Sequence, residues 1–504
     1  MAVLPRGDNV SDDLRTSLEI PKRVLNFIGG QECAARGGEE YPKLAPATGS
    51  RLCSVVRSRA ADVDAALRAA RAAQPAWAEA TPVFRGDLLR EIALAMRAHQ
   101  EEIACIVHSE TGKSLKDARG ETTAAIEMGL FVAGEGRRFY GRTTTSAVPH
   151  RRSMTVRQPL GVAGLIIAAN TPIANVAWKA FPALLCGNTA VLKASEDTPA
   201  TAWAFGRLAA AAGLPPGVFN LVHGYGEEAG APLVESPETD VISFTGSCEV
   251  GRYIQRTAGA RLAKVCLELG GKNPLIVCDD ANLDSAATAA ILSAFSNAGQ
   301  RCAAGSRIIV QDAVYARFRD LLVARTRQLS VGSGDDDDYG PVINEEQLNG
   351  MLAAVEQARA EGATVLTGGH RLSGSKYAAG YFVAPTLIEG ASAGAPISRT
   401  ELFGPISCLY RVPDFESALA LANDSPFGLT AAIHTTSMHR AMVFTSKIQA
   451  GVAVVNGATY GSEPHMPFGG LKQSGNGWRE AGTEALDVYS DWKTVYINYD
   501  PTAV

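Results

Sequence analysis

Gly161-Val-Ala-Gly-Leu-Ile-Ile-Ala-Ala-Asn170 and Thr189-Ala-Val-Leu-Lys193 are two short apolar runs that each end in a polar residue. Runs of this kind, too short for helices, are typical of strands buried in a parallel sheet. The apolar pattern of Asn175–Leu185 between them predicts a helix. Strand, helix and strand in this order predict a βαβ unit, whose ligands bind at the carboxyl ends of the strands.

The same alternation extends over most of the chain. The strands expected in this region are Val162–Ala168, Thr189–Lys193, Val218–Val222 and Val241–Phe244, with helices at Asn175–Leu185, Thr198–Ala212 and Val250–Gly259. A second series begins near Lys264, with strands expected at Val265–Leu269, Pro274–Val277 and Arg307–Val310 and helices at Leu283–Ala298 and Tyr315–Leu329. Two such series predict an α/β protein with a Rossmann-type cofactor domain and a second α/β domain.

Segments nearer the two ends of the chain do not follow this alternation. Residues 60–100 and Ala124–Phe139 have Ala-rich helical patterns. Thr143–Thr145 and Met154–Val156 predict an exposed strand pair. Lys493–Tyr499 predicts a strand without a neighbour in sequence, so we expect it to pair with this ribbon, either of the same subunit or of another.

Composition narrows the class of protein. The 504 residues carry a net charge of −5, and no apolar run is long enough to cross a bilayer, so neither nucleic acid nor membrane is an expected partner. The nine cysteines are odd in number and form no Cys-x-x-Cys pair. This usage argues against a disulfide framework and a metal site, and it favours a cytoplasmic location. Residues 1–20 lack an apolar core and are expected to form a loose tail.

One cysteine stands in a distinctive context. Cys302 ends the stretch Phe295-Ser-Asn-Ala-Gly-Gln-Arg-Cys302, between an expected helix and an expected strand. Gly299 allows the backbone to turn closely around a bound group, and the cation of Arg301 should favour the thiolate. A thiolate is the active form of a cysteine nucleophile. Most single cysteines are packing residues, so this interpretation depends on the groups that surround it.

Glu268 is a carboxylate between two leucines on a strand that should be buried. Burial of an unpaired carboxylate is costly and raises its pKa, which would suit a general base near neutral pH. An ion pair with Lys264 or Lys272 remains an alternative interpretation.

Polar residues at other strand ends indicate oxyanion and cofactor sites. The Asn170 amide could donate to an oxyanion, although a turn-forming role remains open. Lys193 and Glu196 follow a strand end, where a nucleotide ribose is usually held. Gly224-Tyr-Gly-Glu-Glu-Ala-Gly230 is similar to a dinucleotide-binding loop but one residue too long. Thr245-Gly-Ser247 joins a strand to a helix N-terminus, which suits phosphate binding.

The combination of these motifs resembles the NAD(P)-dependent aldehyde dehydrogenase superfamily, over nearly the whole chain. The matching segments, in the family's order, are Phe244–Ser247, Leu267–Gly271, Asn297–Cys302, Glu401–Pro405 and Pro467–Gly475. Several independent motifs in order are far more specific than any one of them. The resemblance implies oxidation of an aldehyde to a carboxylic acid through a thioester on Cys302.

The resemblance also implies a division into three parts. Residues 21–141 and 159–268 would form the NAD(P)-binding domain, and residues 269–485 the catalytic domain. Residues 142–158 and 486–504 would form a β oligomerisation arm. Subunits with such an arm associate, so the resemblance implies a homodimer or a homotetramer.

Individual roles follow from the same resemblance. Cys302 would be the nucleophile and Glu268 the base, and Asn170 with the Cys302 backbone N–H would form the oxyanion hole; Lys193 completes the set implied as catalytic. The residues implied in cofactor binding are Ile167, Lys193, Ser195, Glu196, Gly226, Gly230, Phe244, Gly246, Ser247, Leu269, Glu401 and Phe403. The Glu196 carboxylate favours NAD, because it would repel a 2′-phosphate, and NADP is the alternative.

Two positions depart from the family pattern. Ala169 stands before Asn170, where the family usually has a bulky tryptophan, and Cys248 stands where it usually has threonine. We interpret Cys248 as a small packing residue, with a redox role as the alternative.

The substrate site is expected at Trp178, Phe295, Arg301, His465 and Phe468. Arg301 could bind an anionic tail, as a semialdehyde-type relative would require, since a guanidinium suits bidentate capture of a carboxylate. It could equally be a surface residue or tune the thiol. The aromatic residues favour neutral aromatic or aliphatic aldehydes instead.

Two other functions are open to a chain of this kind. A non-catalytic relative could serve as a binding or structural protein, but Cys302 and Glu268 are both present. A CoA-acylating aldehyde dehydrogenase would use a thiol in place of water, and a water-activating Glu268 argues against it.

Overall fold

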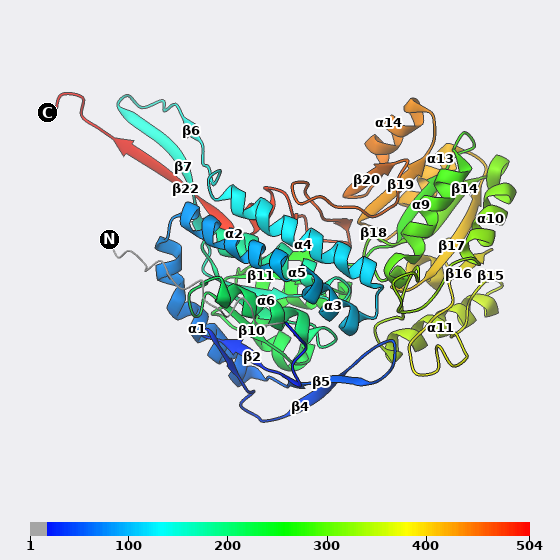
Figure 1. Ribbon diagram of the computed structural model, residues 1–504. Coiled ribbons are helices and arrows are strands. Elements are labelled where there is room, and N and C mark those ends of the chain that lie inside the picture. The colour runs from blue at the N-terminus through cyan, green and yellow to red at the C-terminus, as the bar shows by residue number, and fades with distance from the viewer. Residues whose placement is uncertain (1–17, 504) are drawn as a thin grey trace.

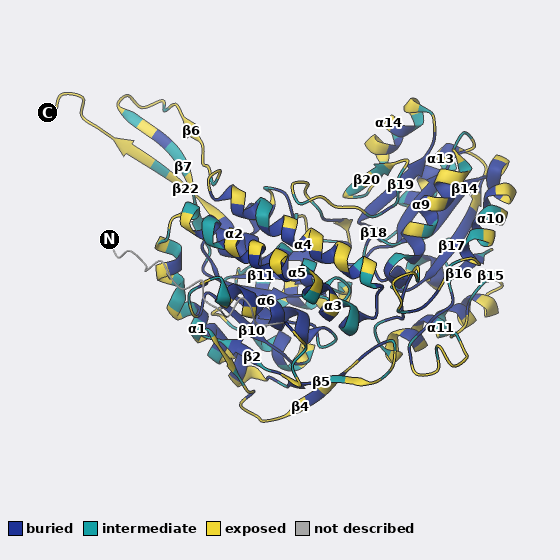
Figure 2. Ribbon diagram, viewed as in Figure 1, coloured by how far each residue is buried: buried dark blue, intermediate teal, exposed yellow. Residues whose placement is uncertain are grey.

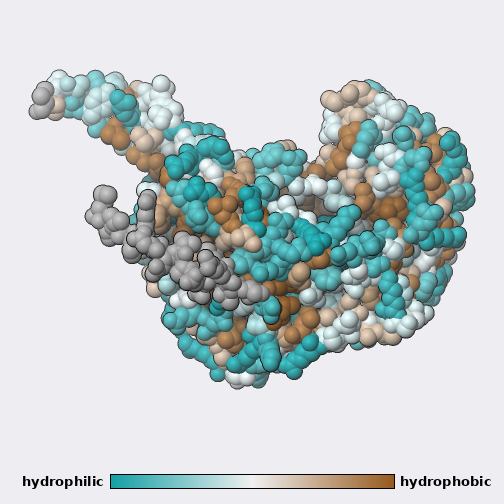
Figure 3. All heavy atoms as spheres, in the orientation of Figure 1, coloured by the Kyte–Doolittle hydropathy of each residue, from teal (hydrophilic) through white to brown (hydrophobic). Residues whose placement is uncertain are grey.

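The computed structural model describes residues 18–503, so residues 1–17 of the expected tail lie outside the described residues. The chain forms two lobes, each built on a seven-stranded sheet, and a narrow ribbon projects from one of them (Figure 1). The space-filling view is hollowed between the lobes (Figure 3). This arrangement confirms the expected fold class, two α/β units with a β arm.

The first lobe carries the sheet β12-β11-β8-β9-β10-β2-β3. Its parallel strands are β8 (Val162–Ile166), β9 (Thr189–Lys193), β10 (Phe219–Val222), β11 (Val241–Thr245) and β12 (Lys264–Glu268), and the short antiparallel strands are β2 (Asn26–Ile28) and β3 (Gln31–Cys33). The chain runs from β8 outward to β10 and then returns to β11 on the other side of β8. This reversal is the switch point at which doubly wound sheets bind their ligands.

Helices cover both faces of this sheet because its strands are apolar on both sides. The helices are α1 (Ala60–Glu79), α2 (Pro82–Ala98), α3 (Gln100–Thr111), α4 (Leu115–Glu135), α5 (Pro172–Leu185), α6 (Pro199–Ala211), α7 (Ala231–Glu235) and α8 (Cys248–Gly259). Val162 and Ile166 of β8 pack on the side of α1, α7 and α8, whereas Ala163 and Leu165 pack on the side of α2–α6. A strand buried on both faces reads as a continuous apolar run, as residues 162–168 do.

The N-terminal helices differ from the sequence expectation. Residues 60–100 form two helices, because Pro82 begins α2 and the Thr81 side chain accepts a hydrogen bond from the Phe84 N–H as its N-cap. The sequence analysis missed α3 altogether; it ends at Gly112, which has a positive φ of 73°. The helix expected at Ala124–Phe139 is α4, which begins nine residues earlier and ends at Glu135.

The second lobe carries the sheet β15-β16-β17-β14-β13-β19-β20, in which only β15 is antiparallel. Its strands are β13 (Asn273–Val277), β14 (Gly305–Gln311), β15 (Thr364–Thr367), β16 (Thr386–Glu389), β17 (Ile406–Val412), β19 (Thr430–His434) and β20 (Val452–Val455). Its helices are α9 (Leu283–Phe295), α10 (Asp312–Thr326), α11 (Glu345–Ala360), α12 (Pro396–Arg399), α13 (Phe415–Asn423) and α14 (Met438–Lys447).

The projecting arm is a three-stranded antiparallel sheet. It pairs β6 (Thr143–Thr144) with β7 (Arg151–Pro159), and β7 with β22 (Ser490–Asn498). The C-terminal strand therefore joins the ribbon of its own chain, one of the two expected pairings. The remaining short elements are β1 (Arg23–Val24), β4 (Glu40–Leu44), β5 (Arg51–Val56), β18 (Phe427–Gly428), β21 (Leu471–Lys472) and α15 (Ala485–Val488).

The burial pattern separates the lobes from the arm. Dark-blue buried residues fill the sheets of both lobes, whereas much of the arm is exposed (Figure 2). Trp492, Tyr496 and Ile497 of β22 are large apolar side chains left exposed in the single chain. Ala481, within the range 269–485 expected for the catalytic domain, packs in the core of the first lobe.

Candidate active site

The segment that connects the two sheets carries Glu268. This residue ends β12, and residues 269–272 lead directly into β13 of the other lobe. The Leu269 N–H donates to the Ser474 carbonyl at 3.0 Å, and the Ser474 hydroxyl donates to the Gly270 carbonyl at 2.7 Å. Glu268 therefore lies at a fixed position at the junction of the lobes.

The loop that carries Cys302 turns sharply after α9. Asn297 and Ala298 have positive φ angles of 53° and 54°, which end the helix earlier than its apolar pattern predicts. Gly299 also has a positive φ, 65°, and a Cβ there would lie 2.2 Å from the Gly404 carbonyl oxygen. Only glycine fits this turn. The close neighbour of Gly299 is the Gly404 carbonyl, so the expected turn around a bound group stays a prediction.

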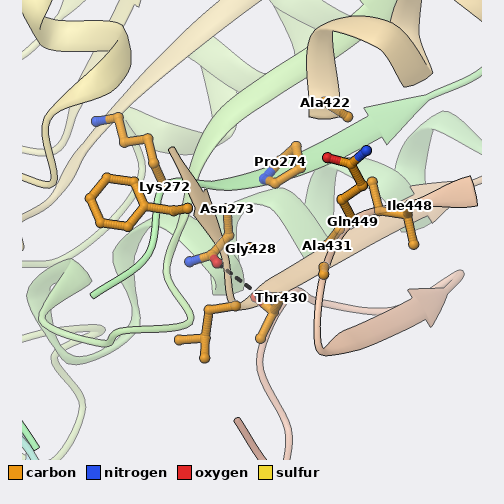
Figure 4. Close-up of a pocket in the computed structure, with 12 residues that line it drawn as sticks. Lys272, Asn273, Pro274, Ala422, Gly428, Thr430, Ala431, Ile448 and Gln449 are labelled. Carbon is orange, nitrogen blue, oxygen red and sulfur yellow. Dashed lines mark hydrogen bonds between the residues drawn. The ribbon is translucent and has the colours of Figure 1, made fainter. Parts of the chain in front are cut away.

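Asn273 ties this loop to the connecting segment. Its Nδ2 donates to the carbonyl oxygens of Cys302 at 2.7 Å and Ala304 at 2.9 Å, and its Oδ1 accepts from the Thr430 N–H at 3.0 Å (Figure 4). A Cβ at Gly271 would lie 2.5 Å from the same Cys302 oxygen. The segments around Glu268 and Cys302 are thus in direct contact, as a shared site requires.

The surroundings of the Cys302 thiol hold its pKa above the usual value. Desolvation is the main cause that raises its pKa, to about 12, and the nearby charges of Glu401 and Glu268 raise it further. Arg301 lowers the pKa, but it is the weakest of these influences. The expectation that Arg301 favours the thiolate agrees with the direction of its effect, but desolvation outweighs its charge.

Glu268 is a buried carboxylate without a partner. It is 5% exposed, and among residues 18–503 neither of its carboxylate oxygens has a hydrogen-bond partner. Desolvation raises the pKa of Glu268 well above its usual value, and the Glu480 charge adds to the effect. The alternative of an ion pair with Lys264 is wrong, because that ammonium donates to the carbonyls of Asp487 and Ser490.

The Asn170 side chain lies beside the cysteine loop. Its Nδ2 donates to the Gln300 carbonyl at 3.1 Å. Its own carbonyl oxygen accepts from Lys113 Nζ at 2.7 Å and from Asn297 Nδ2 at 3.3 Å. The structure thus brings Asn170, Glu268 and Cys302 together from three separate parts of the sequence.

The ribose side of the expected cofactor site lies at the carboxyl ends of β9 and β10. Lys193 Nζ contacts Glu196 Oε2 at 2.8 Å, and the Ile167 N–H donates to the Lys193 carbonyl. Ser195 is buried beside them. A Cβ built at Gly226 or at Gly230 would meet nothing within 4 Å. This strand edge therefore carries polar groups, and the two glycines beside it face open space.

The residues expected to flank the pyrophosphate lie between β11 and β12, where α8 begins. Ser247 caps α8 by accepting from the Val250 N–H, and the Gly246 N–H donates to the Glu268 carbonyl at 3.1 Å. A Cβ at Gly246 would lie 2.4 Å from the Phe244 ring. A helix N-terminus at the switch point suits an anionic group. Leu269 packs over the first turns of α8, where a Cβ at Gly251 would lie 2.7 Å from it.

Glu401 reaches toward the same region from the second lobe. Its Oε1 accepts from the Gly271 N–H at 2.8 Å. Desolvation raises the pKa of Glu401 to about 7, against the opposing effects of this hydrogen bond and of Lys272. Phe403, two residues on, has a positive φ of 54°, an unusual backbone conformation for a bulky residue.

The expected substrate residues fall into two groups. Trp178 and Phe468 stack edge to face with ring centroids 5.5 Å apart, and His465 lies exposed near Glu463. Phe295, by contrast, is 2% exposed and belongs to the core of the second lobe. A contact between Phe295 and substrate stays a prediction.

Arg301 is held by three neighbours. Its guanidinium lies 4.7 Å from the Tyr460 ring centroid, 3.8 Å from Asp117 Oδ1 and 3.2 Å from Ser296 Oγ. Both charged side chains are about one quarter exposed. Arg301 is therefore a partly buried residue that its neighbours hold in place.

Sequence analysis missed several buried polar residues of the site. Lys179 contacts both Glu480 and Ser243 behind Glu268, and Lys113 pairs with Glu121 behind Asn170. The signal for Lys179 was a lysine within an otherwise apolar helix, which is costly unless the charge is paired. Their partners lie far away in sequence, so no local pattern identifies them.

Within residues 18–503, no cluster of three or more His, Cys, Asp or Glu side chains could hold a metal ion, and no helix is long and apolar enough to span a membrane.

Comparison with known proteins identifies this arrangement. The aldehyde dehydrogenase family model matches residues 33–495. The chain is 40% identical to alpha-ketoglutaric semialdehyde dehydrogenase of Bacillus subtilis, over 94% of this chain and 98% of that protein. It is 38% identical to alpha-ketoglutarate semialdehyde dehydrogenase of Haloferax volcanii, over 94% and 99%. A crystal structure of Staphylococcus aureus betaine aldehyde dehydrogenase with NAD+ superposes with a TM-score of 0.93, at 32% identity over 98% of each chain.

The chain therefore belongs to the aldehyde dehydrogenase family. It is an NAD(P)-dependent aldehyde dehydrogenase, an enzyme that oxidises an aldehyde to the carboxylic acid.

Proposed function

We propose that Cys302, Glu268 and Asn170 carry the reaction in the roles that the family resemblance implies. The observation that carries this proposal is the unpaired carboxylate of Glu268, buried beside the Cys302 thiol. A buried carboxylate with a raised pKa and no partner is costly to keep unless it accepts a proton during turnover.

The steps follow from the positions of these side chains. The Cys302 thiol releases its proton to solvent, and the sulfur then attacks the aldehyde carbon as its thiolate and forms a thiohemiacetal. The Asn170 amide and the Cys302 backbone N–H donate to the oxyanion. NAD+, when bound, accepts the hydride and leaves a thioester on the sulfur. Glu268 then takes a proton from a water molecule while the water oxygen attacks the thioester carbon. The carbon–sulfur bond breaks, which releases the acid and returns the Cys302 thiolate.

We propose that the carboxyl edge of β9, β10 and β11 holds the cofactor. Lys193 and Glu196 would hold the adenosine ribose, and Gly226, Gly246 and Ser247 would flank the pyrophosphate. NAD is favoured over NADP, because Glu196 already pairs with Lys193 at 2.8 Å and would repel a 2′-phosphate. Glu401 and Phe403 would contact the nicotinamide ribose and ring.

The proposed substrate is a semialdehyde with a carboxylate tail. The two relatives at 38–40% identity are named for such substrates. Arg301 supports the proposal, because it stands next to the nucleophile and is held in place by Tyr460. Its contact with Asp117, at 3.8 Å, is long enough for a substrate carboxylate to replace it.

A second candidate is a neutral or cationic aldehyde. The Trp178–Phe468 aromatic pair and the Asp117 carboxylate favour it, and the Staphylococcus aureus neighbour is named for betaine aldehyde. In that case Asp117 would stay paired with Arg301 during turnover.

A matched pair of variants tests the proposed substrate. Arg301→Leu should raise KM for an ω-carboxyl aldehyde about 10-fold while KM for the neutral aldehyde of equal length stays unchanged. Asp117→Asn should lower KM for the carboxyl aldehyde about threefold, because a competing carboxylate is removed. Equal effects on both aldehydes would support the second candidate.

Cys302→Ala tests the mechanism itself, since it should bind NAD+ and show no turnover.

Assembly, location and domain limits are also proposed. We infer a homodimer or homotetramer, because the arm exposes Trp492, Tyr496 and Ile497, which a partner subunit would bury. Sedimentation of Tyr496→Glu beside the unaltered protein tests this inference.

We propose a cytoplasmic location from the odd number of cysteines. For the three parts of the chain we propose these limits: 21–141 with 159–268 for the cofactor domain, 269–485 for the catalytic domain, and 142–158 with 486–504 for the arm.

A further inference from the structure

Lys113 and Glu121 form a buried ion pair that the mechanism above does not use. Lys113 lies in the link between α3 and α4 and is 3% exposed, and Glu121 lies in α4 and is 8% exposed. Lys113 Nζ contacts Glu121 Oε2. An ion pair removed from water in this way is no strong source of stability, because desolvation cancels much of the attraction.

Both members of the pair hold the turn that carries Asn170. Lys113 Nζ donates to the Asn170 carbonyl oxygen at 2.7 Å. Glu121 Oε1 accepts from the Ile173 N–H at 3.0 Å and from the Ala174 N–H at 3.4 Å, in the first turn of α5. The pair therefore fixes both ends of the segment 170–174.

The N-terminus of α6, in the same lobe, is also capped by a buried glutamate. Among the described residues, this second cap has no lysine bonded to the carbonyl that precedes the helix, so capping by itself does not require one. Glu110, which is also buried, caps α6 by accepting from the N–H groups of Ala200 at 2.7 Å and Thr201 at 2.8 Å, and from the Thr201 hydroxyl. Its own capping contacts include no ammonium group. At α5, the lysine adds a bond to the peptide of the residue whose amide lies beside Cys302.

We propose that Lys113, held by Glu121, is a positioning residue for the oxyanion hole. It fixes the Asn170 peptide so that the side-chain amide can donate to the oxyanion of the thiohemiacetal. In the structure described here that amide donates to the Gln300 carbonyl, two residues before Cys302. The inference rests on the proposed role of Asn170.

Lys113→Met tests the proposal. A thioether side chain of similar length cannot donate to the Asn170 carbonyl. The single-turnover rate of NADH formation at saturating NAD+ and aldehyde should fall about 10- to 100-fold, as misplacement of a reacting group does. The dissociation constant for NAD+, measured by titration in the absence of aldehyde, should stay within about twofold. An unchanged single-turnover rate would overturn the proposal.

Two further variants separate positioning from folding. Lys113→Met leaves Glu121 buried without its partner, so the double variant K113M/E121Q removes both charges and should recover thermal stability but not the rate. Lys43→Met is a matched control, because Lys43 is equally buried and pairs with Asp197 but is not bonded to Asn170. It should keep the single-turnover rate at saturating NAD+. Recovery of the rate in K113M/E121Q would assign the pair a purely structural role.

Asn170→Ala distinguishes failure of this inference from failure of the proposed function. A slow N170A with a fast K113M/E121Q would overturn the positioning role alone. A fast N170A would overturn the oxyanion role and the positioning role together. If both are slow, the combination K113M/N170A should be no slower than N170A, because the two residues act through one group; a further additive loss would overturn the proposal.

Discussion

Glu268 and Glu401 are two carboxyl groups that approach Cys302 from opposite lobes, and the difference between them separates two kinds of function. Glu268 ends β12, the edge strand that leads into the other lobe, and has no hydrogen-bond partner within the described residues. Glu401 lies on a loop after α12, and its carboxylate accepts from the Gly271 N–H. A fixed and unsatisfied carboxylate suits proton transfer, whereas a satisfied one on a loop can exchange its partner when a ligand binds.

The largest effect should come from Glu268→Gln. The amide cannot take a proton from water, so the thioester should accumulate and steady-state turnover should fall about 10²- to 10⁴-fold. The first turnover should still release NADH as a burst equal to the enzyme concentration. Stopped-flow absorbance of NADH measures both phases. Sustained turnover at neutral pH would contradict the role of Glu268 as the base.

Glu401→Gln should have a smaller effect on a different step. If this residue positions the nicotinamide ribose, hydride transfer itself should slow about 10-fold, and the burst should become slower than in the unaltered enzyme. The same stopped-flow traces distinguish the variants. A fast burst followed by slow turnover in Glu401→Gln would mean that the two carboxylates share one function.

The reactivity of Cys302 should report on both carboxylates at once. In the cofactor-free protein the thiol has a pKa of about 12, so its alkylation by iodoacetamide should speed up with pH through pH 9 without a plateau. Glu401→Gln should lower this pKa more than Glu268→Gln, because Glu401 is the larger electrostatic cause. The alkylation rate as a function of pH, followed by mass spectrometry of the Cys302 peptide, measures it. A plateau of the alkylation rate near neutral pH in the unaltered protein would contradict the raised pKa of the Cys302 thiol.

The smallest effect should appear in stability. Because the folded protein raises the pKa of Glu268, it binds that proton more tightly than the unfolded chain does. Stability from this group is complete below the unfolded pKa and falls as pH rises above it. The difference in Tm between Glu268→Gln and the unaltered protein should therefore depend on pH. It should be a few degrees more favourable to the variant at pH 9 than at pH 5. Melting curves of both proteins at both pH values measure this change. A Tm difference between variant and unaltered protein that is the same at pH 5 and pH 9 would argue against a buried, unpaired Glu268.

Much of the fold was predictable because local patterns carried it. The strand Thr189–Lys193 was predicted with its observed bounds, and the other central strands to within a few residues. Helix limits were less accurate where turns decided them. α9 stops at Phe295 because Asn297 and Ala298 adopt positive φ angles, and no apolar pattern reveals that. The separation of α1 from α2 depends on the cap at Thr81 before Pro82, a local signal that was present but not used.

The sequence by itself determined the fold class, the family and the residues that meet in the site, because these depend on apolar periodicity and on short motifs that keep their spacing. Only the tertiary structure decided what surrounds those residues. It showed that desolvation raises the pKa of the Cys302 thiol despite Arg301. It also showed that Lys113 holds the Asn170 carbonyl from 57 residues away in sequence, and that Glu121 holds the Ile173 N–H from 52 residues away. The physical reason is that desolvation and long-range hydrogen bonds depend on what packs around a group, which neighbours in sequence do not specify.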